Sequence, residues 1–283
     1  MARNRRRWQV AAIQMTSTED RERNLAVAER LARRAADAGA TLVAFPENFT
    51  YLRLRRRNRY ADSLDGELMT RLAELAKDLG VYLLAGSIPE EIPGSDLVHN
   101  TSVLFSPAGK RLAVYRKMHL FDVRIRGRAV FEESSLVAPG NDPVIADTPL
   151  GRLGLTICYD LRFPELYRRL ALAGAEVLFV PSAFTAYTGR AHWLPLLQAR
   201  AIENQCWVVA PAQVGRHGPR RESHGSTAVI DPWGTVVAKR ARGEGIVSAE
   251  IDLDHEARIR TGLPCLEHVR SGLLATQERR RKG

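Results

Sequence analysis

The cysteine at position 158 stands where a nucleophile is typically found. It follows an apolar segment, residues 153–157, which we predict to be a strand, and it precedes a helix that starts near Pro164. Side chains at the carboxyl end of a strand in an α/β sheet emerge at a crevice, and the N–H groups of a helix start lie close by. We therefore expect a lowered thiol pKa and a nucleophilic Cys158. A lone cysteine is more often a small buried core residue, an alternative that stays open for Cys158 and that we adopt for Cys206 and Cys265.

Two further residues with catalytic chemistry also follow predicted strands. Glu47 comes after residues 41–45, between proline and aromatic neighbours, and apolar surroundings raise the pKa of a carboxyl towards the range of a general base. Lys117 comes after residues 111–115. The alternatives are a surface glutamate and one solvated lysine in a chain that is rich in basic residues. Each residue alone is a weak signal.

Short apolar segments alternate with amphipathic helices along the chain, which predicts an α/β fold with helices layered on sheets. The first predicted helix, residues 20–38, collects its leucines and alanines on one face and ends at Gly39, so its apolar side must pack on a sheet. The other predicted helices are 67–79, 164–173 and 192–204, and the predicted strands are 10–14, 41–45, 81–87, 98–105, 111–115, 153–157, 177–180, 207–210 and 245–251.

Two hairpin turns, at residues 106–110 and 231–234, indicate that the sheets are mixed. Residues 117–139 show no periodicity, and a long loop of this kind inside a compact domain is usually functional, so we expect it near the active site. We predict one domain over residues 8–270, flanked by basic, flexible termini at residues 1–7 and 271–283.

The composition favours a soluble, cytoplasmic protein that binds neither membrane nor nucleic acid. Three cysteines are an odd number, which argues against a disulfide framework, and no segment approaches the ~20 apolar residues of a membrane span. The net charge of +10 comes largely from arginine, without the aromatic residues that accompany a basic nucleic-acid-binding stripe, so we predict a solvated basic surface. Such a positive field favours an anionic substrate.

Metal-dependent and serine-dependent chemistry have little support. The histidines His119, His192, His217 and His224 lack the spacing of a metal-binding motif, and the sequence contains neither a Gly-x-Ser-x-Gly elbow nor a phosphate-binding glycine loop. We predict no metal and no cofactor. His192 starts a predicted helix and is a candidate for lining the substrate pocket, with capping or packing as the alternative.

The segments around Glu47, Lys117 and Cys158 resemble the nitrilase superfamily of carbon–nitrogen hydrolases, whose catalytic residues are a glutamate, a lysine and a cysteine in this order. A second glutamate of the family is matched by Glu133, with Glu132 as the alternative. The resemblance covers nearly the whole chain. It is carried by residues 14–15, 45–47, 116–122, 157–166 and 231–234.

The resemblance implies an amidase reaction through a thioester on Cys158. In this mechanism Glu47 removes the thiol proton and later activates water, while Lys117 and the backbone N–H of Tyr159 stabilise the oxyanion. Glu133 orients Lys117 or the substrate amide. The implied fold is an α-β-β-α sandwich with mixed sheets and helices outside, which assembles into a homodimer or a larger homo-oligomer.

Residues 181–184, 188–193, 199–205 and 212–217 resemble the Nit branch of the superfamily. This implies a small carboxylate-bearing amide as substrate, and we expect deaminated glutathione, cleaved to 2-oxoglutarate and cysteinylglycine. The alternatives are α-ketoglutaramate or a nitrile and, from a different class, an inactive binding or scaffold protein on the same fold. The expected substrate contacts are Arg162, Phe184, Arg190 and His192. Arg190 replaces an expected proline and either binds a substrate carboxylate or lies on the surface.

Overall fold

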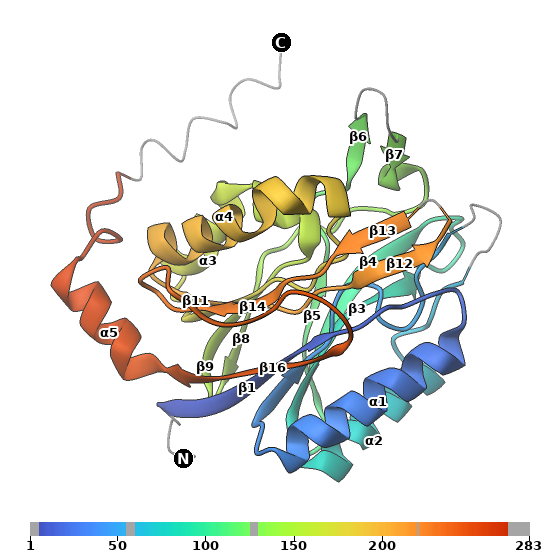
Figure 1. Ribbon diagram of the computed structural model, residues 1–283, viewed down its shortest axis with the longest axis horizontal. Coiled ribbons are helices and arrows are strands. Elements are labelled where there is room, and N and C mark those ends of the chain that lie inside the picture. Colours follow the sequence, from blue (N-terminus) through green and yellow to red (C-terminus); the bar gives the residue numbers. More distant parts are fainter. Residues whose placement is uncertain (1–5, 55–59, 125–129, 220, 271–283) are drawn as a thin grey trace.

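Two six-stranded mixed sheets lie face to face in the structure, a computed structural model that describes residues 6–54, 60–124, 130–219 and 221–270 (Figure 1). The first sheet has the order β16-β1-β2-β3-β4-β5, with β1 (Arg7–Gln14), β2 (Leu42–Ala44), β3 (Tyr82–Glu91), β4 (Val98–Phe105), β5 (Arg111–Arg116) and β16 (Gly245–Asp252). The second has the order β15-β14-β11-β10-β9-β8, with β8 (Val144–Thr148), β9 (Gly151–Leu155), β10 (Val177–Phe179), β11 (Trp207–Ala210), β14 (Thr227–Ile230) and β15 (Val236–Arg240).

Each sheet has three parallel strands at its centre, β1-β2-β3 in the first and β9-β10-β11 in the second, with antiparallel strands on both sides. Because β5 is antiparallel to β4, and β4 to β3, β5 runs in the same direction as β2. The carboxyl ends of β2 and β5 therefore lie at the same edge of the first sheet, and the residues that follow these two strands are Glu47 and Lys117.

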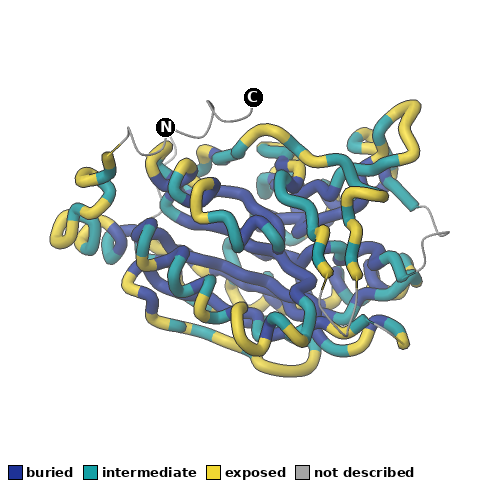
Figure 2. Tube along the Cα trace, turned by 90° about the horizontal axis from the view of Figure 1, so that it is seen from above, coloured by how far each residue is buried: buried dark blue, intermediate teal, exposed yellow. Residues whose placement is uncertain are grey.

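The central strands are buried on both faces, and their side chains alternate between two cores. In β1, Val10 and Ala12 face the core between the sheets, whereas Ala11 and Ile13 face the core under the helices. This alternation explains why the strands read as continuous apolar runs. Figure 2 shows these buried strands inside a more exposed layer of loops and helix surfaces.

Helices cover the outer face of each sheet, so the α-β-β-α sandwich and the mixed sheets are confirmed. Leucines and alanines of α1 (Arg21–Asp37) and α2 (Glu67–Leu79) pack on the first sheet. The second sheet is covered by α3 (Pro164–Leu172) and α4 (Ala186–Asn204), and α5 (Leu253–Gly262) follows the last strand. Asp20 caps α1 by accepting a hydrogen bond from the Arg23 N–H.

The structure corrects the predicted start of one helix. Helix α4 begins at Ala186 and not at His192, because the Thr185 side chain accepts the N–H of Thr188 and caps the helix one and a half turns earlier. Gly189 lies inside this helix and packs directly on His224, where a Cβ atom would come within 2.4 Å of the His224 Cβ.

The predicted irregular loop at residues 117–139 also contains regular structure. It holds a small hairpin, β6 (Asp122–Arg124) with β7 (Val130–Glu132), and a 3-10 turn, η1 (Glu133–Ser135). Sequence reasoning missed this hairpin, strand β8 and the hairpin of β12 (Val214–Gly218) and β13 (Arg221–His224), because short, partly polar strands lack the apolar alternation that identifies longer ones.

Most of the predicted basic termini lie outside the described residues. Of residues 1–7, only Arg6 and Arg7 are described, and Arg7 already begins β1, where its guanidinium pairs with Asp252. Within the described ranges, no helix is both long and apolar enough to cross a membrane.

Candidate active site

Glu47 is held in place by four different parts of the chain. Its side chain is 3% exposed, and Oε1 accepts hydrogen bonds from Lys117 Nζ and Asn100 Nδ2, both at 2.9 Å. Oε2 accepts the backbone N–H of Ala183 at 2.8 Å, and the main-chain carbonyl of Glu47 accepts Gln213 Nε2 at 3.0 Å. One oxygen is therefore fixed from the first sheet and the other from the second.

The approach of β3 to the Glu47 loop requires a glycine. A Cβ atom on Gly86 would lie 2.0 Å from the carbonyl oxygen of Phe45 and 2.2 Å from that of Pro46. Any larger residue at position 86 would push the loop, and with it Glu47, away from the sheet.

Lys117 is 2% exposed and lies between two carboxylates. Its Nζ donates to Glu47 Oε1 at 2.9 Å and to both oxygens of Glu133, at 3.0 and 2.9 Å. The backbone N–H of Lys117 donates to the Asn100 carbonyl at 2.9 Å, so the neighbouring strand β4 positions both members of the ion pair.

Cys158 opens the 3-10 turn η2 (Cys158–Arg162), directly before α3, and is 8% exposed. Its φ of 47° lies in the left-handed region, which is uncommon for a residue with a side chain. Its N–H donates to the Pro181 carbonyl at 3.0 Å, and its thiol lies beside the Glu47 carboxylate, which acts on the pKa of the thiol. Tyr159 is the second residue of the turn, so its N–H belongs to the first-turn amides that lack an intrahelical acceptor.

The ionisation of this group differs from the sequence prediction. Burial raises the pKa of Glu47, but the charge and hydrogen bond of Lys117, with the bonds from Cys158 and Ala183, outweigh it and leave the pKa below its ordinary value. Burial and the charge of Glu47 raise the pKa of the Cys158 thiol far above its ordinary value, although Lys117 opposes them. The predicted raised pKa of Glu47 and lowered pKa of Cys158 are both wrong, because Lys117 stabilises the Glu47 carboxylate, and burial together with that carboxylate destabilises the Cys158 thiolate.

The resting site is therefore a carboxylate, an ammonium and a neutral thiol. Burial lowers the pKa of Lys117, but Glu133 and Glu47 more than compensate and raise it well above its ordinary value. A carboxylate beside a protonated thiol is a general base already next to its proton donor.

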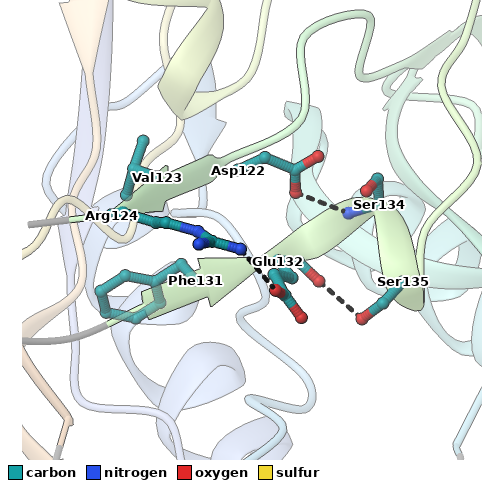
Figure 3. A pocket seen from close by; sticks show the side chains of 7 residues that line it. All are labelled: Asp122, Val123, Arg124, Phe131, Glu132, Ser134 and Ser135. Carbon is teal, nitrogen blue, oxygen red and sulfur yellow. Dashed lines mark hydrogen bonds and ion pairs between the residues drawn. The ribbon is translucent and has the colours of Figure 1, made fainter.

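Of the two adjacent glutamates, Glu133 contacts Lys117 and Glu132 points to the surface. Oε2 of Glu133 also accepts the N–H of Phe121 at 2.6 Å. Figure 3 shows the outer side of the same hairpin, where the Asp122 carboxylate accepts the N–H of Ser134 and Glu132 faces Arg124 across a surface pocket. The hairpin in the predicted irregular loop thus turns one glutamate inward and its neighbour outward.

A buried aspartate that sequence reasoning missed connects the segments carrying Lys117 and Cys158. Asp160 is fully buried, and its Oδ2 accepts the Tyr115 hydroxyl at 2.7 Å and the Ile157 N–H at 2.8 Å. Its Oδ1 accepts the N–H of His119 at 3.1 Å and contacts His119 Nδ1 at 2.7 Å. Tyr115 and His119 flank Lys117, so a single carboxylate sets the spacing of the two strand ends.

Aromatic and cationic side chains gather beside Cys158. The Arg162 guanidinium lies 5.0 Å from the ring centre of Phe184 and 5.9 Å from that of Tyr159, and its Nη1 is 3.3 Å from His192 Nδ1. The structure thus brings together Arg162, Phe184 and His192. The fourth predicted contact, Arg190, is exposed, and no direct contact joins it to these three side chains among those found in the described residues.

Asn100 and Ala183 were also missed. A buried asparagine inside the apolar strand β4 is a signal that the sequence does offer, since a buried amide requires a polar partner. The Ala183 N–H offers none, because any residue supplies a backbone donor. Cys206 is buried as predicted, whereas Cys265 is exposed beside the last helix, which corrects its assignment to the core. Within the described part of the chain, no cluster of three or more His, Cys, Asp or Glu side chains is suited to hold a metal ion.

Comparison with known proteins identifies relatives of the whole chain. Residues 9–261 match the family model described as "Carbon-nitrogen hydrolase". A deaminated glutathione amidase from Synechocystis sp. is 45% identical over 266 residues, covering 91% of this chain and 96% of the relative.

Two solved structures are also similar. The Caenorhabditis elegans NitFhit protein has a TM-score of 0.88 at 40% identity, over 96% of this chain and 67% of that one. Saccharomyces cerevisiae Nit3, described as a member of branch 10 of the nitrilase superfamily, has a TM-score of 0.80 at 31% identity, over 96% and 97% of the two chains.

Proposed function

This chain belongs to the carbon–nitrogen hydrolase family and is a hydrolase of carbon–nitrogen bonds other than peptide bonds, and from this premise we propose that it hydrolyses deaminated glutathione to 2-oxoglutarate and cysteinylglycine. The relatives at 41–45% identity include amidases named for this substrate. The observation that carries the proposed chemistry is the contact of one carboxylate, Glu47, with both the Lys117 ammonium and the Cys158 thiol.

In the first half-reaction, Glu47 accepts the thiol proton as the Cys158 sulfur attacks the amide carbonyl carbon. The carbonyl oxygen becomes an oxyanion, which Lys117 and the Tyr159 N–H stabilise; one such donor is worth about 3 kcal/mol in comparable sites. The protonated Glu47 then gives its proton to the departing amine nitrogen. The carbon–nitrogen bond breaks, cysteinylglycine leaves, and the 2-oxoglutarate part remains on sulfur as a thioester through its C5 carbonyl.

In the second half-reaction, the carboxylate of Glu47 removes a proton from water, which attacks the thioester carbonyl. The second oxyanion collapses, the carbon–sulfur bond breaks, and the thiolate recovers its proton from Glu47. Throughout, Glu133 holds the Lys117 ammonium in place through its two hydrogen bonds. The third donor of the ammonium points at Glu47 in the resting site, and it turns to the oxyanion when Glu47 has taken up the thiol proton.

The remaining side chains have proposed supporting roles. Arg162, Phe184 and His192 form the wall that receives the substrate, with the apolar face of Phe184 against its methylene groups. Arg190, exposed on the first turns of α4, acts at the pocket rim. We also propose a single catalytic domain over residues 8–270, a cytoplasmic location and assembly into a homodimer or a larger homo-oligomer, all of which rest on the sequence and the family resemblance.

Comparing three substrates tests the proposed function. Purified wild-type protein and Cys158→Ala are assayed with deaminated glutathione, α-ketoglutaramate and a simple nitrile. We expect the highest kcat/KM with deaminated glutathione, no turnover of the nitrile and no activity in Cys158→Ala. Equal or higher kcat/KM with α-ketoglutaramate would contradict the substrate assignment, and residual amidase activity in Cys158→Ala would contradict the thioester mechanism. A wild type that released no amine from any amide would support an inactive scaffold instead.

A further inference from the structure

The β12–β13 hairpin forms one wall of the candidate active site. Next to β12, Gln213 donates to the main-chain carbonyl of Glu47, and at the end of β13 the N–H of His224 donates to the Phe184 carbonyl at 2.9 Å. A β-bridge joins Ser223 to Thr185, at the start of α4. The hairpin is therefore attached both to the segment that carries the general base and to the segment that carries the aromatic wall.

A buried histidine fixes the geometry of this hairpin. His217 Nδ1 is 2.7 Å from the Ser17 carbonyl oxygen, and its Nε2 is 2.8 Å from Ser223 Oγ. Burial, assisted by the charge of Arg221, lowers the pKa of His217 to about 4 despite the bond to Ser17. The ring is therefore neutral at neutral pH, and Arg221 is a partly buried cation of the same hairpin.

Arg221, the first residue of β13, makes fewer hydrogen bonds to described residues than its guanidinium has N–H donors. It is partly buried, and its Nη1 donates to the Arg53 carbonyl at 3.1 Å. Among the residues that the structure describes, no carboxylate lies within 4.0 Å of its guanidinium. A guanidinium carries five N–H donors in a planar fork, so one bond to a carbonyl leaves an edge that suits a carboxylate.

The same guanidinium lies within electrostatic reach of the catalytic residues. Burial lowers the pKa of Arg221, and the negative charges of Glu47 and Glu133, with that of Cys158 when its thiol ionises, act against this decrease. Arg200, a buried arginine of α4, is engaged with the Leu161 carbonyl and with Glu203.

We propose that Arg221 binds the free C1 carboxylate of the 2-oxoglutarate part of the substrate. The assignment rests on the proposed function, whose substrate carries one carboxylate on the acyl side of the scissile bond and one on the dipeptide. The acyl group stays attached to the buried Cys158 after the amine has left, so its carboxylate needs a cation at the depth of the nucleophile. Arg221 is partly buried and close enough to Glu47 and Glu133 for their charges to act on its guanidinium, whereas Arg190 is exposed.

Three substrates and three variants test this assignment. The substrates are deaminated glutathione, α-ketoglutaramate, which keeps the acyl carboxylate but lacks the dipeptide, and 4-oxopentanamide, in which a methyl group replaces that carboxylate. The variants are Arg221→Gln, Arg221→Lys, which keeps the charge without the fork, and Arg216→Gln, a matched control that removes an exposed arginine from β12, opposite Glu222. Thermal unfolding of each variant checks that the fold is retained.

We expect Arg221→Gln to raise KM about 10- to 100-fold for both carboxylate substrates, the range of a lost charge-assisted hydrogen-bond pair. On 4-oxopentanamide its kcat/KM should stay within about threefold of wild type, because that amide offers the fork no carboxylate. Arg221→Lys should recover part of the loss, and Arg216→Gln should behave as wild type.

Other outcomes overturn the assignment in distinguishable ways. A loss restricted to deaminated glutathione would place Arg221 against the leaving dipeptide, and an equal loss on all three substrates would make it part of the catalytic electrostatics. No loss at all would mean that another group binds the carboxylate. Failure of the wild type to hydrolyse either carboxylate substrate would instead refute the proposed function, and that result is visible before any Arg221 variant is assayed.

Discussion

The ammonium nitrogen of Lys117 lies 2.9 Å from Oε1 of Glu47, and both side chains are almost completely buried. Two opposite charges in such a place are stable only because the remaining donors and acceptors are also satisfied, by Asn100, Ala183 and Glu133. The consequence is chemical, because the pair keeps Glu47 ionised beside a protonated thiol, which is the arrangement needed to start nucleophilic attack.

The ionisation states predict a broad pH profile. The pKa of Glu47 is depressed below 4.5, and those of Cys158 and Lys117 are raised above 9.0 and 10.5. With a neutral amide as substrate, kcat/KM should therefore be constant from about pH 5 to about pH 9, because none of these three side chains changes its charge in that range. Initial rates across this interval, in buffers of constant ionic strength, measure it. If kcat/KM instead rose between pH 6 and 8, as it would for an enzyme whose thiol ionises in that range, these protonation states would be wrong.

The two adjacent glutamates provide a matched pair of variants. Glu133→Gln removes the charge that faces Lys117 on the hairpin side, so we expect kcat/KM to fall by about 10²-fold, comparable to the loss of an oriented oxyanion donor. Glu132→Gln changes a side chain on the outer face of the same hairpin and should leave kcat/KM within about twofold, as is usual for surface substitutions. Steady-state kinetics of both variants measure these effects. A larger loss of kcat/KM in Glu132→Gln than in Glu133→Gln would mean that Glu132, and not Glu133, supports Lys117.

Asp160→Asn tests the link between the Lys117 and Cys158 segments. The asparagine amide would direct its NH₂ group at groups that now donate hydrogen bonds to the Asp160 carboxylate. We therefore expect the free energy of unfolding to fall by about 2–4 kcal/mol, and the activity to fall with it. Chemical denaturation and kcat/KM are the measurements. Asp147→Asn is the control, because Asp147 pairs with Arg152 on the surface, where such ion pairs contribute little. Equal effects of the two substitutions would show that the network does not position the site.

The helix after the last strand carries a buried acid with a predictable pH signature. Burial raises the pKa of Glu256 to about 9, although Arg260 lies 2.8 Å away and opposes the shift. A carboxyl with a raised folded-state pKa binds more protons in the folded than in the unfolded protein between about pH 4.5 and 9, so it lowers stability progressively as the pH rises through this interval.

Glu256→Gln removes that titration. Relative to wild type, the variant should therefore gain melting temperature as the pH is raised from 5 to 9, and thermal unfolding at several pH values measures the difference. A constant difference across this range would mean that Glu256 is ionised in the folded protein.

The sequence by itself determined the layered α/β architecture. The spacing of apolar residues identifies helices and strands, and glycine and proline mark where they end, and both signals are local in the chain. It also determined the three strand-end residues Glu47, Lys117 and Cys158, since their position follows from where each apolar run stops. The resemblance to a family added Glu133, and the structure shows that Glu133, not Glu132, contacts Lys117.

Only the tertiary structure decided which groups those residues meet and what charge they carry. Asn100, Asp160 and the Ala183 N–H come from distant segments, and the pKa directions of Glu47 and Cys158 are opposite to those predicted from their neighbours in sequence. Electrostatic energy depends on distance through space and on burial, and neither follows from the identity of adjacent residues. The short polar hairpins β6–β7 and β12–β13 were not predicted for a related reason. Their sequences lack the alternation of apolar residues that identifies a strand, so their formation depends on contacts with the rest of the fold.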